Sequence, residues 1–248
     1  MLKSKYFKKA LLAASFVILV ISLLAIFIYF KIEKTAGVKE LIIILTVVAI
    51  IVCLTLITTI SIYEYYLDSS EKELEEMDIG EIVVAGGCFW GVEEYFKRVK
   101  GIVETEVGYS QGTKINPTYE EVCSQNTNHA EVVYLKYNRA EISLKKIMEL
   151  LFRIIDPTSL NKQANDVGTN YRTGIYYLDE NDREEIESFI AKANQHYQQK
   201  KVVVECEKLY NYFKAEDYHQ EYLSVKPNGY CHVDFSKLKD NEKKVEYL

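Results

Sequence analysis

The sequence lacks the features that mark a metal-binding or a nucleic-acid-binding protein. None of its five cysteines forms a C-x-x-C pair and its four histidines are scattered, so we expect no structural zinc site and no other cofactor. The formal net charge is -6, and no segment after residue 66 carries a basic stripe that could neutralise phosphates, which excludes nucleic acid as an expected partner. No internal repeat and no low-complexity stretch occur. The cysteines do not form the framework of a small disulfide-rich domain, and reactive thiols are expected instead.

Charge is missing from two long segments near the N-terminus. Residues 10–30 and residues 41–63 contain no charged side chain, and each run is long enough to cross a hydrocarbon core of roughly 30 Å as a helix. Four lysines within the first nine residues leave a secretory signal peptide as an alternative for the first run, but that run exceeds the usual apolar core of roughly 7 to 15 residues and no small-x-small cleavage site follows. The sequence predicts an anchor over residues 1–66 with two transmembrane helices.

The segment between the two runs, residues 31–40, is too short to be a domain, so the two helices are expected to form a hairpin. Four lysines precede the first run and Lys72 follows the second, against three lysines in the connecting segment. The positive-inside rule then predicts that the N-terminus and everything after Tyr66 are cytoplasmic. We expect a multi-pass protein of the cell membrane, with the lipid bilayer as one partner and the soluble domain in the cytoplasm.

A spacer rich in Glu and Lys, residues 67–78, leads to a soluble domain over residues 79–248, which is long enough for one buried core. Ser143 is expected to cap a helix, and the chain from Asn211 onward is expected to be a long functional tail. The order of elements predicts an α+β fold, a two-layer α/β sandwich of ferredoxin-like type. The apolar spacing predicts strands at residues 81–85, 103–109, 130–137, 173–177 and 202–206, and helices at residues 90–99, 144–154, 181–200 and 216–223.

Cys88 lies in the segment Gly86-Gly87-Cys88-Phe89-Trp90-Gly91, between a predicted strand and a predicted helix. Unpaired N–H groups and the dipole at a helix start stabilise a thiolate. The glycines let a substrate approach the sulfur, and Phe89 and Trp90 offer an aromatic wall. The alternative is a cysteine packed as a small hydrophobe in a tight turn. The glycine and aromatic neighbours favour a nucleophile.

The segment Gly87 to Gly91 resembles the signature of the type A peptide methionine sulfoxide reductases, and the resemblance continues in order over residues 82–231. Nothing in it covers the predicted membrane hairpin. The other segments that resemble family motifs are Val107-Gly108-Tyr109, Asn116-Pro117-Thr118-Tyr119, His129-Ala130-Glu131-Val132-Val133, Asp156-Pro157-Thr158, Asn165-Asp166-Val167-Gly168-Thr169, Tyr171-Arg172, Ala215-Glu216-Asp217-Tyr218-His219-Gln220 and Gly229-Tyr230-Cys231.

This resemblance implies reduction of methionine S-sulfoxide, free or in proteins, as repair of oxidative damage. Cys88 would be the nucleophile, and Phe89 and Trp90 would hold the S-methyl group. Glu131 would protonate the departing oxygen, because a sulfoxide sulfur is a poor electrophile until then, and an aromatic pocket keeps a carboxyl protonated. The hydroxyls of Tyr119 and Tyr171 would be further donors, while Asp166 and His219 would support the pocket.

Each of these supporting residues also has a plain structural reading. Glu131 could be a solvated charge at the head of a strand, and the tyrosines could be packing residues among the 20 in the chain. Asp166 could be a turn residue, and His219 could be a surface histidine.

The recycling of the nucleophile is assigned to Cys231. Attack on a sulfoxide leaves a sulfenic acid, which a nearby thiol condenses to a disulfide. Cys231 lies in a glycine-containing tail that is flexible enough to bring two sulfurs together, and no cysteine follows it. The resemblance implies a Cys88 to Cys231 disulfide, reduced by thioredoxin or a thioredoxin-like protein. Cys123 and Cys206 are expected to be structural.

Two other classes of function remain open at this point. Cys88 and His219, with Asp217 or Asp166, could form the nucleophile, base and orienting group of a cysteine hydrolase. A hydrolase has no use for a resolving thiol, so Cys231 favours the reductase. The second alternative is a non-enzymatic membrane hairpin that displays a binding domain.

Overall fold

The structure is a computed structural model that describes residues 36–197 and 200–248. The chain divides into two compact units, Met1–Glu76 and Met77–Leu248, which are described separately. The first charge-free run, residues 10–30, lies outside the described residues, and so does the choice between a transmembrane helix and a signal peptide.

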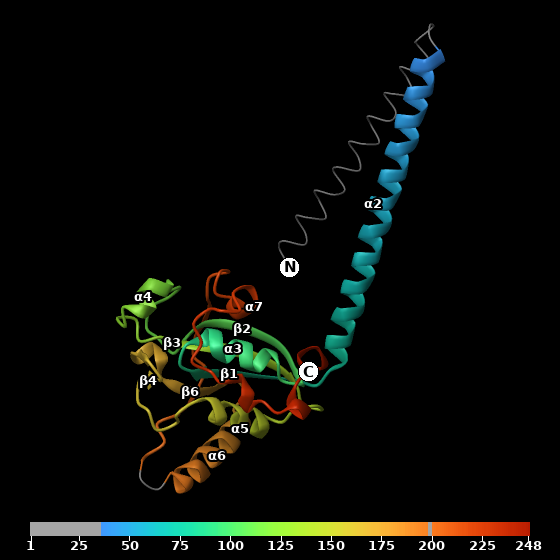
Figure 1. Ribbon diagram of the computed structural model, residues 1–248. Helices are drawn as coiled ribbons and strands as arrows, with labels where there is room; N and C mark the ends of the chain where they lie inside the picture. The colour runs from blue at the N-terminus through green and yellow to red at the C-terminus, as the bar shows by residue number, and fades with distance from the viewer. Residues whose placement is uncertain (1–35, 198–199) are drawn as a thin grey trace. The chain divides into compact units, whose positions relative to one another are not determined.

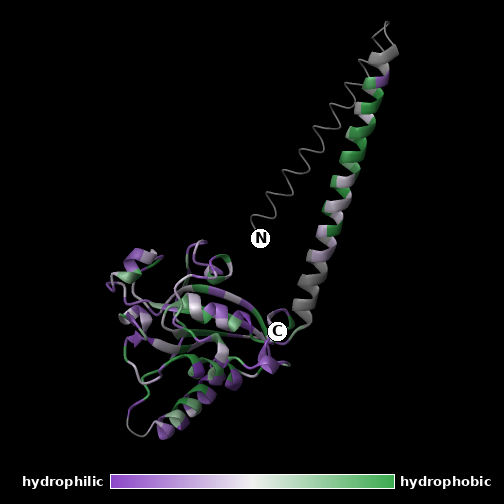
Figure 2. Cartoon of the chain, viewed as in Figure 1, coloured by the Kyte–Doolittle hydropathy of each residue, from purple (hydrophilic) through white to green (hydrophobic). Residues whose placement is uncertain are grey.

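The described part of the first unit, from residue 36, is the long helix α2 (Ala36–Glu76), which includes the second charge-free run (Figures 1 and 2). Within the described part of the chain, its segment Thr46–Tyr63 is the one helical stretch with the length and composition of a membrane span, with a mean hydropathy of 2.3 and 6% of it buried. The hydroxyls of Thr55 and Thr58 donate to carbonyls one turn earlier, which satisfies these polar groups within the helix itself. Residues 36–40, predicted as loop, and most of the predicted spacer are helical.

The second unit is built on a six-stranded sheet with the order β7-β6-β1-β3-β2-β8 (Figure 1). All neighbouring strands are antiparallel except β6 and β7. The central order β6-β1-β3-β2 is that of a ferredoxin-like β-α-β-β-α-β unit, whose two crossovers are α3 and α5. The elements of this unit are β1 (Ile79–Gly86), α3 (Phe89–Lys97), β2 (Ile102–Ser110), β3 (Ala130–Asn138), α5 (Leu144–Ile154) and β6 (Thr173–Tyr177), followed by α6 (Asp182–His196), β7 (Glu205–Lys208) and β8 (Tyr212–Lys214).

The two faces of the sheet bury different amounts of apolar surface. Along β1, Ile82 and Val84 face the main core, which includes side chains of α3 and α5, whereas Val83 and Ala85 face a smaller cluster. This alternation is the consequence of the period of two along a strand. The helices therefore cover one face, as a two-layer sandwich requires.

Several elements follow directly from local sequence signals. Ser143 caps α5, because its hydroxyl accepts the Lys146 N–H at 3.2 Å. A five-residue helix that was not predicted, α4 (Tyr119–Cys123), begins at a capping box of Thr118 and Glu121. Other short elements were also missed: β4 (Lys162–Gln163), β5 (Asp166–Val167) and the 3-10 helix η1 (Thr169–Tyr171).

Three boundaries differ from the predictions. The helix expected over residues 216–223 is wrong for most of its length, since only α7 (Tyr222–Val225) is helical and turns precede it. The predicted helix over residues 181–200 ends at His196. The last strand was predicted to begin at residue 202, but β7 (Glu205–Lys208) begins three residues later, because it pairs with β6 only from Glu205 onward.

The C-terminal segment is docked on the domain. The Glu242 carboxylate accepts bonds from Lys146 at 2.6 Å and from Arg153 at 2.7 Å, both on α5. Burial acts to raise the pKa of Glu242, but the hydrogen bonds from Arg153 and Lys146 outweigh it and lower the pKa to about 2. The guanidinium of Arg98, the C-cap residue of α3, lies over the ring of Phe235 at 4.2 Å. This contact joins the same segment to α3.

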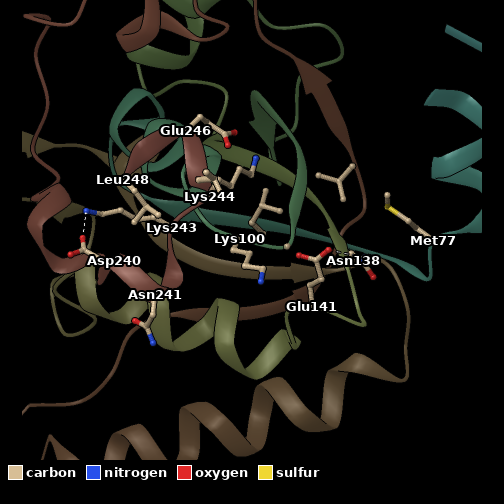
Figure 3. Close-up of a pocket in the computed structure, with 14 residues that line it drawn as sticks. Met77, Lys100, Asn138, Glu141, Asp240, Asn241, Lys243, Lys244, Glu246 and Leu248 are labelled. Atoms are coloured by element: carbon tan, nitrogen blue, oxygen red, sulfur yellow. Dashed lines mark hydrogen bonds and ion pairs between the residues drawn. The ribbon is translucent and has the colours of Figure 1, made fainter. Parts of the chain in front are cut away.

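A cavity of about 520 Å³ lies between this docked segment and the turn before β2. Lys100, Glu141 and Lys244 are among its lining residues (Figure 3). No residue assigned to the chemistry by sequence lines this cavity. It is therefore separate from the site described next.

Candidate active site

Cys88 lies at the junction of β1 and α3. It occupies the N-cap position of α3, where its side chain makes no capping bond, and it is 5% exposed. The turn depends on Gly87, whose φ is +85° and whose added Cβ would lie 2.7 Å from the Cβ of Gln163. The backbone thus presents the sulfur at the start of a helix, as the sequence predicts.

The charge state of Cys88 differs from the prediction. Burial raises the pKa of this thiol well above its usual value, and the nearby Glu131 carboxyl raises it further. The backbone N–H of Trp90 acts in the opposite direction but is the weaker influence. The expectation of a stabilised thiolate is therefore wrong for this structure, because desolvation outweighs the helix terminus.

Glu131 lies on β3 with its carboxyl against the start of α3. Its Oε2 accepts the Phe89 N–H at 3.2 Å, and its Oε1 accepts the side-chain amide of Asn170 at 3.2 Å. The residue is 1% exposed, and burial raises its pKa to about 8 despite these two bonds. The reading of Glu131 as a solvated charge is wrong, and the carboxyl is mostly protonated near neutral pH.

An aromatic group surrounds this junction. The Phe89 ring is 1% exposed and stacks with Tyr119 at a centroid distance of 6.5 Å. The Trp90 ring stacks on Tyr222 at 4.0 Å. Tyr222 was not singled out from the sequence, because its place opposite Trp90 depends on the turns before α7. The wall can hold a methyl-sized apolar group.

Tyr119 and Tyr171 belong to the same cluster. Burial raises the pKa of each hydroxyl, and the Glu131 carboxyl is the next cause in both cases. Cys123 also interacts with the Tyr119 hydroxyl. Both tyrosines remain protonated and can donate hydrogen bonds.

His219 is buried rather than on the surface. It is 2% exposed, and its Nδ1 accepts the indole N–H of Trp90 at 3.2 Å. Burial lowers its pKa, so the ring is neutral. Among the described contacts, no hydrogen bond joins it to Cys88. The Cys–His pair that a hydrolase requires is therefore not formed.

Asp166, on β5, lies between the Cys88 pocket and the C-terminal tail. Its charge contributes to the raised pKa values of both Cys88 and Glu131. Its Oδ2 accepts the Tyr230 hydroxyl at 3.0 Å and lies 3.8 Å from the His232 Nδ1. Asp166 therefore contacts the C-terminal tail as well as the pocket, a link that the sequence did not indicate.

Cys231 packs against the first turn of α3. A Cβ on Gly91 would lie 2.9 Å from its sulfur, so the glycine makes room for the thiol. Cys231 also contributes to the raised pKa of Cys88, which puts both sulfurs in one neighbourhood. The two cysteines are unbonded, as are the other described cysteines. The tail that was predicted to be flexible is docked here.

A buried cysteine at a helix start, a buried acid beside it and a second thiol packed against the same helix are the groups that a thiol-dependent oxidoreductase requires. Residues 80–247 match the family described as peptide methionine sulfoxide reductase. The chain belongs to this family, and its activity is the thiol-dependent reduction of methionine sulfoxide. The hydrolase alternative is not favoured.

Individual relatives agree with this assignment. The chain is 55% identical over 153 residues to the peptide methionine sulfoxide reductase MsrA of Clostridium perfringens, which covers 62% of this chain and 97% of the relative. It is 52% identical over 161 residues to MsrA of Ureaplasma urealyticum, covering 65% and 97%.

Two solved structures share the fold. Reduced Mxr1 from Saccharomyces cerevisiae has a TM-score of 0.58 at 33% identity, over 63% of this chain and 91% of that chain. Methionine sulfoxide reductase A of Corynebacterium diphtheriae has a TM-score of 0.60 at 32% identity, over 62% and 77%.

Proposed function

We propose that this protein is a membrane-anchored reductase of methionine S-sulfoxide, in which Cys88 attacks and Glu131 supplies the proton. The observation that carries the proposal is the buried Glu131 carboxyl, with its pKa raised to about 8, bonded to the N–H of the residue that follows Cys88. An acid that is protonated at pH 7 beside the nucleophile is what sulfoxide reduction needs.

The reduction step conserves atoms and protons. The Cys88 sulfur attacks the protonated sulfoxide, and the oxygen passes to the Cys88 sulfur as its bond to the substrate sulfur breaks, which leaves methionine and a Cys88 sulfenic acid. Glu131 gives its proton to the oxygen and regains one from the Cys88 thiol. Both groups have raised pKa values and start protonated, which fits such a relay.

The remaining residues of the pocket serve binding and support. Phe89 and Trp90 would hold the S-methyl group, and the hydroxyls of Tyr119 and Tyr171 would donate to the oxygen. Asp166 would orient groups on both sides of the pocket. His219 would support the wall through its bond from Trp90.

Recycling would use Cys231. Its thiol attacks the Cys88 sulfur, the Cys88–Cys231 disulfide forms, and the oxygen leaves as water. The packing of Cys231 on the same helix turn supports this role. A thioredoxin-like dithiol would then reduce the disulfide by exchange.

Stereochemistry tests the activity of this chain directly. Separate enzymes reduce the two sulfoxide epimers. The full chain with a small dithiol should reduce the S epimer of a methionine sulfoxide peptide and leave the R epimer almost untouched. Equal rates on both epimers, measured by chromatography of the products, would refute the proposal.

The anchor is proposed on separate grounds. Segment Thr46–Tyr63 has the length and mean hydropathy of a span, and apolar side chains such as Leu54 are more than half exposed. With a second span over residues 10–30, the catalytic domain would lie on the cytoplasmic side of the cell membrane. Reporter fusions at the C-terminus and within residues 31–40 should report opposite sides, and a shared side would overturn the hairpin.

A further inference from the structure

His232 is a buried side chain next to Cys231 to which the reaction assigns no role. Its side chain is 3% exposed. Its Nε2 lies 3.1 Å from the carbonyl oxygen of Gly86, at the end of β1 and two residues before Cys88. The same nitrogen would lie 3.2 Å from a Cβ on Gly87, so the imidazole packs directly on the turn that presents the nucleophile.

The hydrogen-bond partners define the tautomer of this ring. A carbonyl oxygen accepts only, so the Nε2 carries the hydrogen and donates it to Gly86. The Nδ1 has no hydrogen-bond partner among the described residues and faces the Asp166 carboxyl at 3.8 Å. Burial lowers the pKa of His232, so the ring is neutral. In this state its one hydrogen bond is a donation to the active-site turn.

The other contacts of the tail hold Cys231 less directly. Tyr230, on the preceding side, is 44% exposed and reaches Asp166 through its hydroxyl. The Glu242 ion pairs lie eleven residues further along. The hydrogen bonds of the sulfur, among the described residues, are with the backbone of Val233, whose N–H lies 3.3 Å away. Of these contacts, the His232 bond is the one that joins the segment of Cys231 to the backbone of the Cys88 turn.

We propose that His232 is a positioning residue of the recycling step: its bond to the Gly86 carbonyl holds the Cys231 thiol against the first turn of α3, ready to attack the Cys88 sulfenic acid. This inference rests on the proposed role of Cys231. It assigns His232 no part in sulfoxide reduction, because that step needs only the Cys88 side of the site.

The step affected is the condensation of a thiol with a sulfenic acid. The Cys231 sulfur bonds to the Cys88 sulfur, the bond from that sulfur to oxygen breaks, and the Cys231 proton leaves with the oxygen as water. Its rate depends on how often the two sulfurs meet in the right geometry. A displacement of about 1 Å can slow such a step on the order of 100-fold.

The test separates the two half-reactions in the full chain. Each protein, fully reduced, is mixed with one equivalent of a methionine S-sulfoxide peptide, and samples are quenched over time. Methionine release reports reduction, and the Cys88–Cys231 peptide in mass spectrometry reports recycling. A dimedone adduct on Cys88 reports the sulfenic acid that waits between them.

Two substitutions at residue 232 distinguish the hydrogen bond from packing. His232→Gln keeps a donor near the place of Nε2, whereas His232→Leu removes it. We expect both variants to release methionine at the wild-type rate, since the Cys88 pocket is intact. His232→Leu should form the disulfide about 10- to 100-fold more slowly and accumulate the dimedone adduct, and His232→Gln should stay within about threefold of wild type. His196→Leu, the same change at an exposed histidine on α6, should match wild type.

The proposal is overturned if His232→Leu forms the disulfide at the wild-type rate, if Gln and Leu slow it equally, or if methionine release falls in step with disulfide formation. Should His232→Leu not fold, His232→Asn replaces it, because the shorter amide cannot reach Gly86, and the same outcomes apply. Absence of any Cys88–Cys231 disulfide in the wild type would refute the proposed role of Cys231 itself, whatever the variants do.

Discussion

The two sulfurs of the site are held by very different parts of the molecule. Cys88 lies between a central strand and a helix, and its surroundings are side chains of the core such as Phe89 and Glu131. Cys231 lies in a segment without regular structure, which is docked on the core by Val233 and Leu238 and by a few side-chain bonds and ion pairs. The first lies within the sheet and helix of the core, and the second lies in a tail that docks on them, so reduction and recycling should respond to different changes.

The largest effect is expected for Cys88, the sulfur that lies in the core. Cys88→Ser should abolish methionine release altogether, because a hydroxyl is far less nucleophilic than a thiol near neutral pH. The assay is a single turnover of the S-sulfoxide peptide. Cys206→Ser, a change of the same kind on β7, is the matched control and should keep the wild-type rate. Methionine release by the Cys88 variant would remove Cys88 from the reaction.

A change on the tail side should separate the two processes. Cys231→Ser should release about one methionine per chain and then stall with thioredoxin, since its Cys88 sulfenic acid has no partner thiol. A small dithiol, which reaches the sulfenic acid directly, should restart turnover. Steady turnover of this variant with thioredoxin would mean that Cys123 or Cys206 resolves the intermediate or that no disulfide is needed.

The Glu131 carboxyl makes the rate of the reduction step sensitive to pH. Glu131→Gln should slow methionine release on the order of 100-fold with little change in substrate binding, because the proton is needed in the transition state. The raised pKa of about 8 means that the active, protonated form is lost as pH rises through that value. Single-turnover rates of the wild type should therefore fall above about pH 8, and the Gln variant should lack this decline. A flat wild-type profile would exclude Glu131 as the acid.

The smallest effect concerns the attachment of the tail. The folded pKa of Glu242, about 2, lies below its usual 4.5, so the pairs with Lys146 and Arg153 stabilise the fold above about pH 4.5 and are lost as pH falls toward 2. Glu242→Gln should lower the free energy of unfolding by about 2 kcal/mol at pH 7 and by less at low pH. Urea denaturation followed by the fluorescence of Trp90, the single tryptophan, measures this.

Glu246→Gln, at an exposed position of the same segment, is the control for Glu242 and should change stability by less than about 0.5 kcal/mol. Equal effects of the two substitutions would show that the Glu242 pairs do not hold the tail.

The core side of the site was largely predictable from the sequence. Runs of β-branched and aromatic residues located β2 and β3, and the helical spacing with Ser143 located α5. These signals are local, because each strand or helix carries them in its own residues. Glu131 was assigned from the resemblance, and its burial on β3 raises its pKa as the chemistry requires.

The tail side was not predictable in the same way. Nothing in the sequence near Asn170, Tyr230 or His232 signals its partner, since each contact joins residues that are far apart in the chain. The glycine before Cys231 suggested flexibility, whereas Val233 and Leu238 are buried in the core and Glu242 pairs with α5, contacts that only the fold brings together. The raised pKa of Cys88 was also missed, because a helix start is visible in a sequence but the depth of burial is not.

The account assigns reduction to Cys88 and recycling to Cys231, and its most direct test is which two cysteines form the disulfide. Fully reduced full-length protein is treated with the S-sulfoxide peptide alone, and its cysteine pairing is mapped by mass spectrometry of blocked digests. Reduction by Cys88 and recycling by Cys231 predict one Cys88–Cys231 bond per methionine released, with Cys123 and Cys206 still reduced. A bond from Cys88 to either of those cysteines, or methionine release that leaves Cys231 as a free thiol, would contradict it.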